Sequence, residues 1–492
     1  MSEFEQPLYE SVAVRELDRR AVAGGIDAAE LMRRAAAAAW RIVGDRWPRC
    51  RRLVVVCGSG NNGGDGYALA ALAAAAGCTV QLVQFGAPPD SPAARAARAA
   101  WARHGQSQPW PVALDPSADL VVDAVLGIGL RRPVAGAMAA MLAAMNAHTA
   151  PILALDVPSG LDADSGRPRG AAVHAALTVS FIAHKAGLWT GVAADYCGDR
   201  LLDTLGVPVD LATAPSPRAW LMPSRIDPQA LPPRRPAAHK GEHGHVLVVG
   251  GAPGMAGAAL LASRATLRAG AGWVSLATHP DHAAALVAAQ PELMVHAVSA
   301  ADALQPLLVR ARVVVLGPGL GQDSWGQALF DTVLASGRPL VLDADGLNLL
   351  ARRPQTLGGA VLTPHPGEAM RLLEAAAVDA VEADRFGSAE ALRDRFGAVA
   401  VLKGAGTVVA GRRLRVCPAG NPGMAVGGMG DVLSGVIGAL MAQGLAPEAA
   451  AATGVLAHAL AADIVARRRG CRGLLPGDVI DALGQPLNPG AW

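Results

Sequence analysis

Polar side chains that could hold a cation and move a proton follow three apolar runs in the first half of the chain. The first group, residues 58–66, reads GSGNNGGDG and combines glycines with two amides and a carboxylate. Asp123 and Asp156 each end an apolar run, and Ser159 follows in the sequence DVPSG. Amide, carboxylate and hydroxyl oxygens bind hard cations, and a free carboxylate can act as an acid or a base. We predict a cation site at Asn62, Asp123 and Ser159, with Asp156 as the proton-transfer group.

Residues 58–66 also satisfy the GxGxxG pattern of dinucleotide-binding loops. That pattern requires an acid about 20 residues farther on, at the end of the next strand, to bind the ribose. Here the next strand ends in the sequence QFG, and no acid precedes Asp90. A hydride-transferring dehydrogenase is therefore the weaker interpretation of this half. A lone aspartate is more often a turn or cap residue, but three polar groups at three strand ends favour a site.

In the second half, a glycine-rich segment leads directly into an apolar stretch that we expect to be helical. Residues 421–431 read NPGMAVGGMGD, and the helix is expected over residues 432–441. Backbone amides at a helix N-terminus bind anions, and a carboxylate there repels phosphate unless it takes part in the chemistry. We therefore predict that Asp431 takes a proton from a hydroxyl group that attacks phosphorus.

A second glycine-rich turn in this half offers amides, a hydroxyl and an ammonium group to an anion. Its residues are Lys403, Gly404, Ala405, Gly406 and Thr407. We predict that this turn binds a nucleotide phosphate. Three more polar loops follow apolar runs, at residues 317–321, 343–348 and 363–368.

Two histidine-containing segments of the second half have more than one interpretation. His365 lies between two prolines, and it is either a structural residue or a catalytic one. Residues 239–245 read HKGEHGH, which is the composition of a metal site, but they precede an expected strand. We interpret them as a flexible segment beside the substrate.

These groups can act together only if the strands before them end at one edge of a sheet. Short continuous apolar runs are typical of parallel strands that are buried on both faces. The runs are residues 53–57, 80–85, 120–123, 152–156 and 177–182 in the first half and 245–249, 274–277, 313–316, 340–343, 360–362 and 398–402 in the second. Alanine-rich stretches of crossover length, such as residues 67–76 and 93–104, are expected helices. The pattern predicts two three-layer α/β domains, the first with a doubly wound, Rossmann-like sheet.

The length of the chain determines the expected number of domains. Its 492 residues exceed what one hydrophobic core usually serves, so two domains are expected. Residues 223–236 are proline-rich and are interpreted as a linker. The domains are therefore predicted at residues 1–222 and 237–492.

Charge and cysteine content exclude several classes of protein. There are 43 basic and 41 acidic residues, and aromatic residues make up only 4% of the chain. This balance argues against nucleic acid and membrane as partners. The six cysteines contain no Cys-x-x-Cys pair and the N-terminus shows no export signal, so a reduced, cytoplasmic protein is expected. The uncharged window 68–89 has the length of a membrane span, but glycine and polar residues divide it into a helix and a strand.

The whole chain resembles the bifunctional NAD(P)H-hydrate repair enzymes, in which an epimerase domain is fused to a dehydratase domain. In the first half the likeness rests on VVCGSGNNGGDGY, VDAVLGIGLRRPVAG, LDVPSGLDADSG and TVSFIAHKAGL. In the second half it rests on HKGEHGHVLVVGG, GPGLG, LDADGLN, LTPHPGE, LKGAGT and GNPGMAVGGMGDVLSG. The second half is also similar to the ribokinase-type fold, so a ribokinase-like sheet is expected there.

For the first half, the resemblance implies a site for the hydrated cofactor around Asp156. The other residues of this site would be Asn61, Asn62, Gly63, Gly64, Asp65, Gly127, Ile128, Gly129, Leu130, Arg131, Arg132 and Pro133. Potassium would be the cation at Asn62, Asp123 and Ser159. With Asp156 transferring the proton, this half would interconvert the R and S epimers of hydrated NADH or NADPH.

For the second half, the resemblance implies an ADP-dependent dehydratase that acts on the S form. Ala258, Gly319, His365 and Asp431 would line the site of the hydrated nicotinamide. The ADP phosphates would bind Lys403, Gly404, Ala405, Gly406, Thr407 and Gly430, with magnesium accompanying the nucleotide. The ring hydroxyl, deprotonated by Asp431, would accept a phosphoryl group from ADP, and its loss as phosphate would give AMP and NAD(P)H.

The sequence leaves some alternatives open. A small-molecule kinase of the ribokinase-like type would use the same Asp431 and glycine loops, and the first half would then be a nucleotide-binding module. The choice of ADP over ATP rests on the resemblance alone, and a homo-oligomer is expected. Met429 replaces the small residue of ribokinase-like anion loops, so we expect an altered fit of the phosphate.

Overall fold

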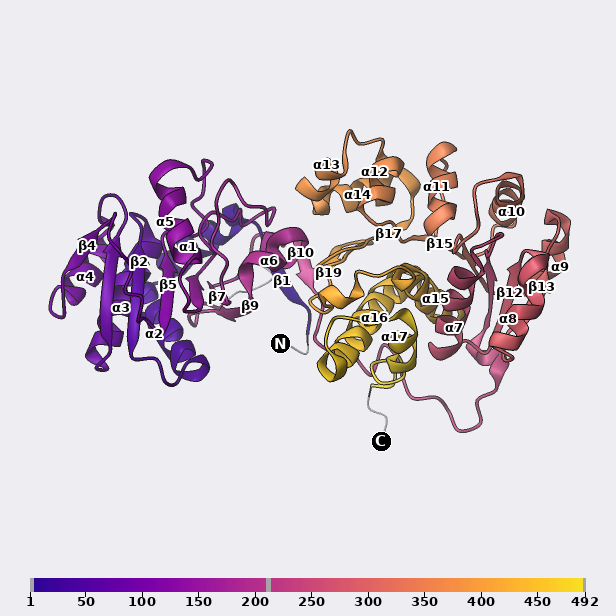
Figure 1. The fold of residues 1–492 in the computed structure, drawn as a ribbon, viewed down its shortest axis with the longest axis horizontal. Helices are drawn as coiled ribbons and strands as arrows, with labels where there is room; N and C mark the ends of the chain where they lie inside the picture. Colours follow the sequence, from indigo (N-terminus) through magenta and orange to yellow (C-terminus); the bar gives the residue numbers. More distant parts are fainter. Residues whose placement is uncertain (1–3, 209–213, 490–492) are drawn as a thin grey trace. The chain divides into compact units, whose positions relative to one another are not determined.

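The computed structural model describes residues 4–208 and 214–489 and divides the chain into two compact α/β units (Figure 1). The N-terminal unit is Pro7–Ala219. The C-terminal unit comprises the described residues from Trp220 onward together with residues 4–6. The proline-rich residues 223–236 belong to the C-terminal unit, where Met222 and Ile226 are buried in the core. The assignment of activities to residues 1–222 and 237–492 stays a prediction.

The sheet of the N-terminal unit has seven parallel strands in the order β4-β3-β2-β5-β6-β7-β9. Their bounds are β2 (Arg52–Cys57), β3 (Thr79–Gln84), β4 (Ser107–Pro109), β5 (Leu120–Ala124), β6 (Ile152–Leu155), β7 (Leu177–Phe181) and β9 (Asp199–Asp203). From β2, the chain builds outward to β4 and then returns to add β5 on the other side. Such a reversal leaves a crevice at the carboxyl ends of the two central strands, here β2 and β5. The doubly wound sheet predicted from the sequence is confirmed.

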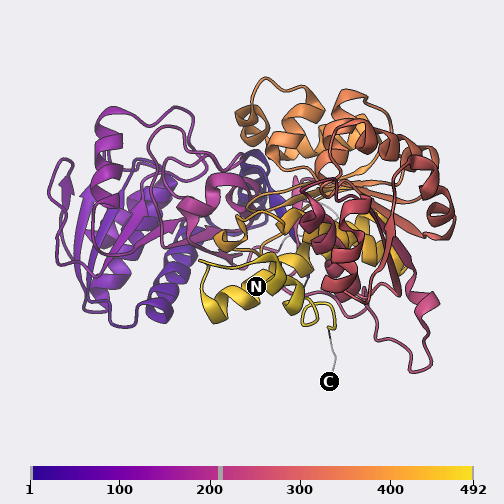
Figure 2. The ribbon, with the colours of Figure 1, turned by 45° about the vertical axis from the view of Figure 1, so that its right-hand side comes forward.

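Both faces of this sheet are covered by apolar side chains and helices (Figure 2). The helices are α1 (Ser11–Ala23), α2 (Ala28–Arg46), α3 (Asn61–Ala75), α4 (Pro92–Trp101), α5 (Gly136–Asn146) and α6 (Ala194–Cys197). Within β2, Val55 belongs to the cluster that contains α2 and α3, while Val54 and Val56 belong to the cluster that contains α5. Alternating side chains of a strand point to opposite faces, which explains why this strand is apolar at every buried position. A short strand β1 (Gln6–Tyr9) pairs with β8 (His184–Lys185).

The sheet of the C-terminal unit repeats the same winding order and then adds antiparallel strands. Its order is β13-β12-β11-β14-β15-β16-β17-β18-β19-β10. The bounds are β10 (Ala219–Leu221), β11 (His245–Val249), β12 (Trp273–Thr278), β13 (Met294–Ala297), β14 (Val313–Leu316), β15 (Leu340–Leu342), β16 (Val361–Leu362), β17 (Val399–Leu402), β18 (Val408–Ala410) and β19 (Leu414–Val416). The strands from β13 to β17 are parallel, and the direction of building reverses between β11 and β14. The antiparallel pairs β17–β18 and β18–β19 are absent from the sequence-based prediction.

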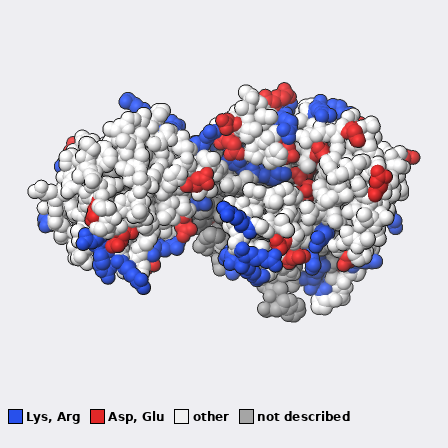
Figure 3. Space-filling model, in the orientation of Figure 1, with Lys and Arg blue, Asp and Glu red and all other residues white. Residues whose placement is uncertain are grey.

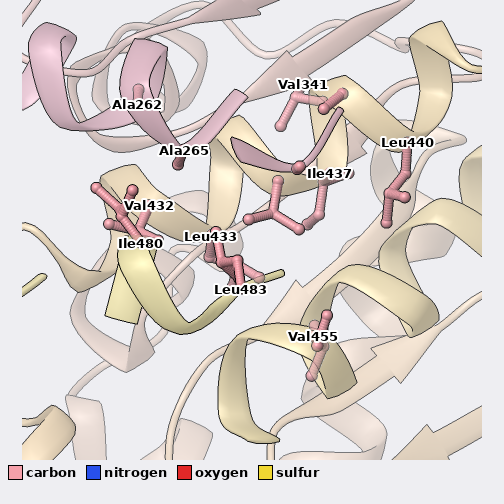
Figure 4. Close-up of a cluster of buried hydrophobic side chains, with 14 of the residues drawn as sticks. Ala262, Ala265, Val341, Val432, Leu433, Ile437, Leu440, Val455, Ile480 and Leu483 are labelled. Carbon is pink, nitrogen blue, oxygen red and sulfur yellow. The ribbon is translucent and has the colours of Figure 1, made fainter. Parts of the chain in front are cut away.

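The core of the C-terminal unit is built around α15, which is buried along almost its whole length (Figure 4). The helices of this unit are α7 (Ala256–Arg268), α8 (Ala283–Ala289), α9 (Gln305–Arg310), α10 (Ser324–Ala335), α11 (Ala344–Arg352), α12 (Pro366–Leu373), α13 (Val378–Ala383), α14 (Arg385–Phe396), α15 (Met429–Ala442), α16 (Pro447–Arg469) and α17 (Pro476–Ala482). A Cβ atom at Gly435 would lie 2.2 Å from the carbonyl oxygen of Ala262 on α7. The absence of a side chain therefore lets the two helices touch through their backbones. Met429 is also buried in this core, so its extra volume lies away from the solvent-facing side of the helix terminus.

One helix of this unit has the length and hydropathy of a membrane span. It is α16, whose apolar window has a mean hydropathy of 1.6 and is 61% buried inside the protein. Its buried side chains join the same cluster as α15, so we interpret it as a core helix. The window 68–89 contains the end of α3 and the strand β3, as predicted.

Residues 4–6 complete the C-terminal unit through charge. Glu5 forms ion pairs with Arg413 and with Arg415, the latter at 2.7 Å. Arg415 also pairs with Glu448 at the start of α16. The first described residues of the chain are thus held by a strand that lies more than 400 positions later. Elsewhere on the face drawn in Figure 3, basic and acidic side chains are interspersed, without a continuous basic area.

Candidate active sites

The carboxyl ends of β2 and β5 approach each other so closely that only glycine fits. A Cβ atom at Gly58 would lie 2.1 Å from the carbonyl oxygen of Val125, and one at Gly63 would lie 2.1 Å from the carbonyl oxygen of Gly58. The sequence suggested that the whole GSGNNGGDG segment is a loop. Its second part is instead helical, because α3 begins at Asn61. Its glycines are needed for close packing, and this requirement outweighs their low helix propensity.

Asp123 and Ser159 form one tightly bonded group at the end of β5. The backbone N–H and the hydroxyl of Ser159 donate to the two carboxylate oxygens of Asp123, at 2.7 and 2.6 Å. Asp123 is fully buried, and burial raises its pKa to about 6 although these hydrogen bonds lower it. In the described part of the chain, no Lys or Arg side chain forms an ion pair with this carboxylate. A bound cation would supply the missing positive charge.

Asn62 supplies an unsatisfied oxygen at the same crevice. Its amide nitrogen donates to the carbonyl oxygen of Leu155 at the end of β6, at 3.1 Å. Its carbonyl oxygen Oδ1 is buried and has no hydrogen-bond partner among the described residues. A buried acceptor without a partner is energetically unfavourable. Asn62, Asp123 and Ser159 therefore fit a hard cation by their chemistry and by this unsatisfied atom.

Asp156 lies beside these residues and is held by a lysine that the sequence analysis did not identify. Its carboxylate forms an ion pair with Lys185, whose side chain is fully buried and also donates to the carbonyl oxygen of Phe181 at 2.9 Å. The backbone of Asp156 is left-handed, with φ of 68°, which is a strained conformation for a residue with a side chain. In the sequence this partner is a single lysine within an apolar run, 29 positions after Asp156, and nothing else marks it. The carboxylate is thus fixed in position at the crevice.

Two further carboxylates surround this ion pair. Burial raises the pKa of Asp65 well above its usual value, and the charges of Asp156 and Asp18 raise it further while Lys185 lowers it. Burial also raises the pKa of Asp18, on α1, to about 6. The sequence analysis predicted Asp65 as a site residue but missed Asp18. Three carboxylates therefore share the field of one buried ammonium group.

The predicted loop 127–133 borders the same carboxylate. A Cβ atom at Gly127 would lie 3.0 Å from Oδ2 of Asp156 and 3.7 Å from the side chain of Asn62. In this loop the side chains of Ile128 and Leu130 are partly buried, and residues 129 and 131–133 are exposed. Asn61 is exposed at the start of α3, where its side-chain oxygen Oδ1 accepts a hydrogen bond from the hydroxyl of Ser91 at 2.9 Å. The structure thus brings Asn62, Asp156 and Gly127 together and leaves the arginines of the loop toward solvent.

In the C-terminal unit, Lys403 lies between two buried carboxylates. Its ammonium nitrogen is 2.9 Å from Oδ1 of Asp343 and 3.8 Å from Oε2 of Glu368. Burial alone would lower the pKa of Lys403, but these two carboxylates outweigh burial and raise it. Burial raises the pKa of Glu368 to about 7, while Lys403 lowers it. The sequence placed Lys403 in a phosphate-binding turn and did not identify Glu368 as its partner.

Asp431 completes this group from the first turn of α15. A Cβ atom on the preceding Gly430 would lie 3.0 Å from the ammonium nitrogen of Lys403, so the two predicted phosphate-binding segments meet. Burial raises the pKa of Asp431 to about 7, with further contributions from Asp343 and Glu368 and a lowering one from Lys403. A carboxylate that titrates near neutral pH is suited to general base catalysis.

The turn 403–407 rests on a buried arginine that the sequence analysis missed. Arg385 donates to the carbonyl oxygens of Leu402 and Lys403, at 3.2 and 3.0 Å, and its side chain is only 2% exposed. The turn needs glycine at position 404, where φ is +139°. The hydroxyl of Thr407 closes the turn by donating to the carbonyl oxygen of Gly404 at 2.9 Å.

His365 has a structural role that can be seen directly. The ring atom Nδ1 of His365 accepts a hydrogen bond from the backbone N–H of Gly367 at 3.0 Å. The backbone N–H of His365 donates to the carboxylate of Glu368 at 2.8 Å, and the two bonds together cap α12. Its ring is half exposed, so the capping leaves the Nε2 edge near Glu368 and solvent. Burial lowers the pKa of His365, as does nearby Lys403. The predicted contact with substrate is not tested by this geometry.

The other two predicted residues, Ala258 and Gly319, are in contact. A Cβ atom at Gly319, where φ is +59°, would lie 2.5 Å from the carbonyl oxygen of Met255 and 3.3 Å from the Cβ of Ala258. Asp345 braces this loop by accepting from the N–H of Gly321 at 2.9 Å. The 239–245 segment contains a short 3-10 turn, and no group of three or more His, Cys, Asp or Glu side chains that could hold a metal ion is found there or elsewhere in residues 4–208 and 214–489.

Comparisons with known proteins match each unit separately and the chain as a whole. The model of the YjeF-related protein N-terminus matches residues 28–187, and the NAD(P)H-hydrate dehydratase model matches residues 246–485. The chain is 46% identical to the Bifunctional NAD(P)H-hydrate repair enzyme Nnr of Coxiella burnetii, over 98% of this chain and 99% of the relative. It is 45% identical to the enzyme of the same name from Escherichia coli, over 94% of this chain and 90% of the relative.

Among solved structures, the C-terminal unit is similar to a ribokinase-like superfamily protein from Enterococcus faecalis. The TM-score is 0.50 at 27% identity, and the match covers 54% of this chain and 95% of that one. The ribokinase-like architecture that the resemblance implied for the second half is therefore confirmed.

The contact between Lys403 and Asp343 leads to a prediction about stability. Lys403→Met would leave buried carboxylates without their cation, and loss of one partner of a buried pair lowers the free energy of unfolding by roughly 3–5 kcal/mol. Adding Asp343→Asn removes the uncompensated charge and is expected to recover most of that loss. Urea unfolding of the full-length protein measures both, with Lys240→Met as the control because Lys240 is exposed. Equal losses in the single and the double variant would contradict the charge argument.

Proposed function

The chain belongs to the family of bifunctional NAD(P)H-hydrate repair enzymes, and on this premise we propose how its two units divide the work. The N-terminal unit is the epimerase, which interconverts the R and S forms of hydrated NADH or NADPH. The C-terminal unit is the dehydratase, which returns the S form to NAD(P)H and uses ADP. The observation that supports this division is that each unit has its own set of buried charged residues near the carboxyl ends of its parallel strands. A kinase with an accessory binding module is not favoured, because relatives that match the whole length carry the repair name.

In the epimerase, Asp156 removes and returns the proton that the interconversion requires. Lys185 holds this carboxylate in position through the buried ion pair, and Gly127 leaves room for the substrate beside Oδ2. The remaining substrate contacts are those of residues 61–65 and 127–133. Asp65, whose pKa burial raises well above its usual value, and Asp18 are two further groups near this ion pair that can hold a proton.

Potassium is the cation that Asn62, Asp123 and Ser159 hold. When bound, it supplies positive charge at the end of β5, next to the carboxylate that burial otherwise disfavours. Two features support this assignment of potassium. Oδ1 of Asn62 is buried and has no hydrogen-bond partner among the described residues, and the fully buried Asp123 forms no ion pair with a Lys or Arg side chain there.

In the dehydratase, Asp431 takes the proton of the ring hydroxyl. The hydroxyl oxygen attacks the terminal phosphorus of ADP and AMP leaves. The C–O bond to the new phosphate group then breaks while the neighbouring ring carbon loses a proton to solvent, and the double bond of the dihydropyridine is restored. Lys403 and the backbone amides of residues 404–407 and 430 bind and orient the phosphates. Magnesium, carried with ADP, neutralises phosphate charge when it is bound. The assembly as a homo-oligomer and the cytoplasmic location remain predictions from the sequence.

Potassium binding predicts a thermal shift. A ligand that is present at ten times its Kd for the folded unit stabilises that unit by about 1.4 kcal/mol, which for a unit of this size raises the melting temperature by about 3–6 °C. Replacing choline by potassium is expected to produce this shift in the wild-type chain and in the Asp90→Asn control, where the aspartate is exposed. Asp123→Asn is expected to abolish it. An equal shift in Asp123→Asn would contradict the assigned ligands.

Replacement of Asp156 is expected to separate the two activities. The wild-type protein, given a mixture of hydrated NADH epimers with magnesium, potassium and ADP, should restore the full absorbance of the dihydronicotinamide band. Asp156→Asn should restore only the fraction that starts as the S epimer, at the wild-type rate, because the dehydratase is intact. Substituting ATP for ADP identifies the donor. A full rapid recovery by Asp156→Asn would show that this carboxylate is not the proton-transfer group.

The dehydratase is expected to lose activity as the pH falls through about 7. The base must be ionised, and the pKa of Asp431 is about 7, so kcat/KM should rise with pH and become constant above this value. Asp431→Asn is expected to reduce it roughly 100- to 10,000-fold. Dehydration of purified S epimer, followed at the dihydronicotinamide band, gives the profile.

Glu368 has a pKa near the same value and serves as the control for this profile. Glu368→Gln removes a negative neighbour of Asp431, so the inflection is expected to persist and to move to lower pH. Disappearance of the inflection in Glu368→Gln would assign it to Glu368 instead.

A further inference from the structure

A polar cavity of about 320 Å³ in the N-terminal unit is lined by three arginines. It lies between the start of α1, the loop after β5 and the segment after β6. Its lining includes Ser11, Arg15, Arg131, Asp162, Asp164 and Arg169. The lining also includes Gly127, Ile128 and Leu130, so the predicted substrate loop 127–133 forms one wall of the cavity. Arg15 and Arg169, on the other walls, are not among the substrate residues inferred from the sequence.

The carboxylates in the cavity wall already have partners within the wall. Asp164 accepts from the N–H and the hydroxyl of Ser11, at 2.5 and 2.8 Å, and so caps α1. Asp162 forms an ion pair with Arg169 at 2.6 Å and accepts from the N–H groups of Asp164 and Ser165. The two carboxylates are therefore already bonded to residues of the cavity wall, where they hold residues 162–165 and the start of α1 in place.

Two of the three guanidinium groups keep an uncompensated charge. Arg15 donates to a neutral acceptor, the carbonyl oxygen of Ile128, at 2.7 Å. Within residues 4–208 and 214–489, neither Arg15 nor Arg131 forms an ion pair with a carboxylate. Arg15 lies one helical turn from Asp18, whose pKa it lowers without direct contact. The cavity therefore favours an anion, and guanidinium groups match the oxygens of a phosphate.

The cavity adjoins the reacting position. Gly127 lines it and also lies against Oδ2 of Asp156. A ligand whose ring lies at Asp156 can therefore extend past Gly127 into the cavity. Hydrated NADH carries a pyrophosphate next to its nicotinamide ribose, and hydrated NADPH carries a further phosphate on its adenosine ribose.

Building on the proposed epimerase function, we propose that this cavity binds a phosphate group of the dinucleotide. Arg15 and Arg169 are then substrate-binding residues in addition to Arg131. Arg15 also links α1 to the loop 127–133, so that binding of the phosphate orders the loop beside Asp156.

Epimerase kinetics test the proposal. Arg15→Gln and Arg169→Gln are expected to raise KM at least tenfold with kcat within twofold, while Arg103→Gln, an exposed residue of the same unit, leaves both unchanged. Arg15 bonds to Ile128 and Arg169 pairs with Asp162, so the two variants lose different protein contacts, and a matching rise in KM points to the ligand that they share. A rise in KM for both hydrated NADH and hydrated NADPH identifies the pyrophosphate, and a rise for hydrated NADPH alone identifies the 2′-phosphate. An unchanged KM for both substrates, or a loss confined to kcat, would overturn the proposal.

A second measurement does not depend on activity. Phenylglyoxal modifies accessible arginines, and mass spectrometry of the full-length protein reports each one separately. Inorganic pyrophosphate or adenosine 2′,5′-bisphosphate is expected to protect Arg15 and Arg131 at least fivefold but not Arg103. Protection in a protein that fails to epimerise would leave the phosphate site standing and reject the proposed function. Absence of protection by both probes would overturn the phosphate site even in an active epimerase.

Discussion

Both units depend on the close approach of two neighbouring parallel strands at the point where the sheet reverses its direction of building. In the N-terminal unit, the glycine after β2 meets the backbone of Val125. In the C-terminal unit, a Cβ atom at Gly250 would lie 2.0 Å from the carbonyl oxygen of Pro318. The backbones touch here, while the chains that follow the two strands diverge, and this divergence opens the crevice. Asp156, which we propose as a catalytic residue, follows the strand β6, whereas Asp431 enters the other proposed site from the first turn of α15.

Each crevice also shares one buried lysine among several carboxylates. Lys185 faces Asp156 with Asp65 and Asp18 nearby, and Lys403 faces Asp343 and Glu368 with Asp431 nearby. Such an excess of buried negative charge raises the pKa of the carboxylates that lack a direct partner. This arrangement is costly for folding, yet it would provide the proton acceptors and the cation-binding oxygens that the two proposed reactions require.

Much of this architecture could be predicted from the sequence because the central strands are apolar at consecutive positions. The runs at residues 245–249 and 313–316 coincide with β11 and β14. The strands β18 and β19 are only three residues long, and Arg415 interrupts the apolar residues of β19. The helix that begins at Asn61 contradicts the loop that its glycines suggest. Lys185 could not be predicted because its partner lies 29 positions away in the chain. Arg385 could not be predicted because it bonds to backbone carbonyl oxygens, which no sequence pattern marks. Periodicity reports burial, whereas these contacts depend on tertiary packing.

The ion pairs of Glu5 with Arg413 and Arg415 have a consequence for biosynthesis. The glutamate leaves the ribosome before either arginine, and its partners emerge roughly 20 to 80 seconds later at ordinary elongation rates. Throughout that interval Glu5 lacks these partners, while the N-terminal unit that lies between them in the sequence is synthesised. The C-terminal unit is therefore completed by residues that are translated before the N-terminal unit, and removal of residues 4–6 would alter contacts made by residues 413 and 415.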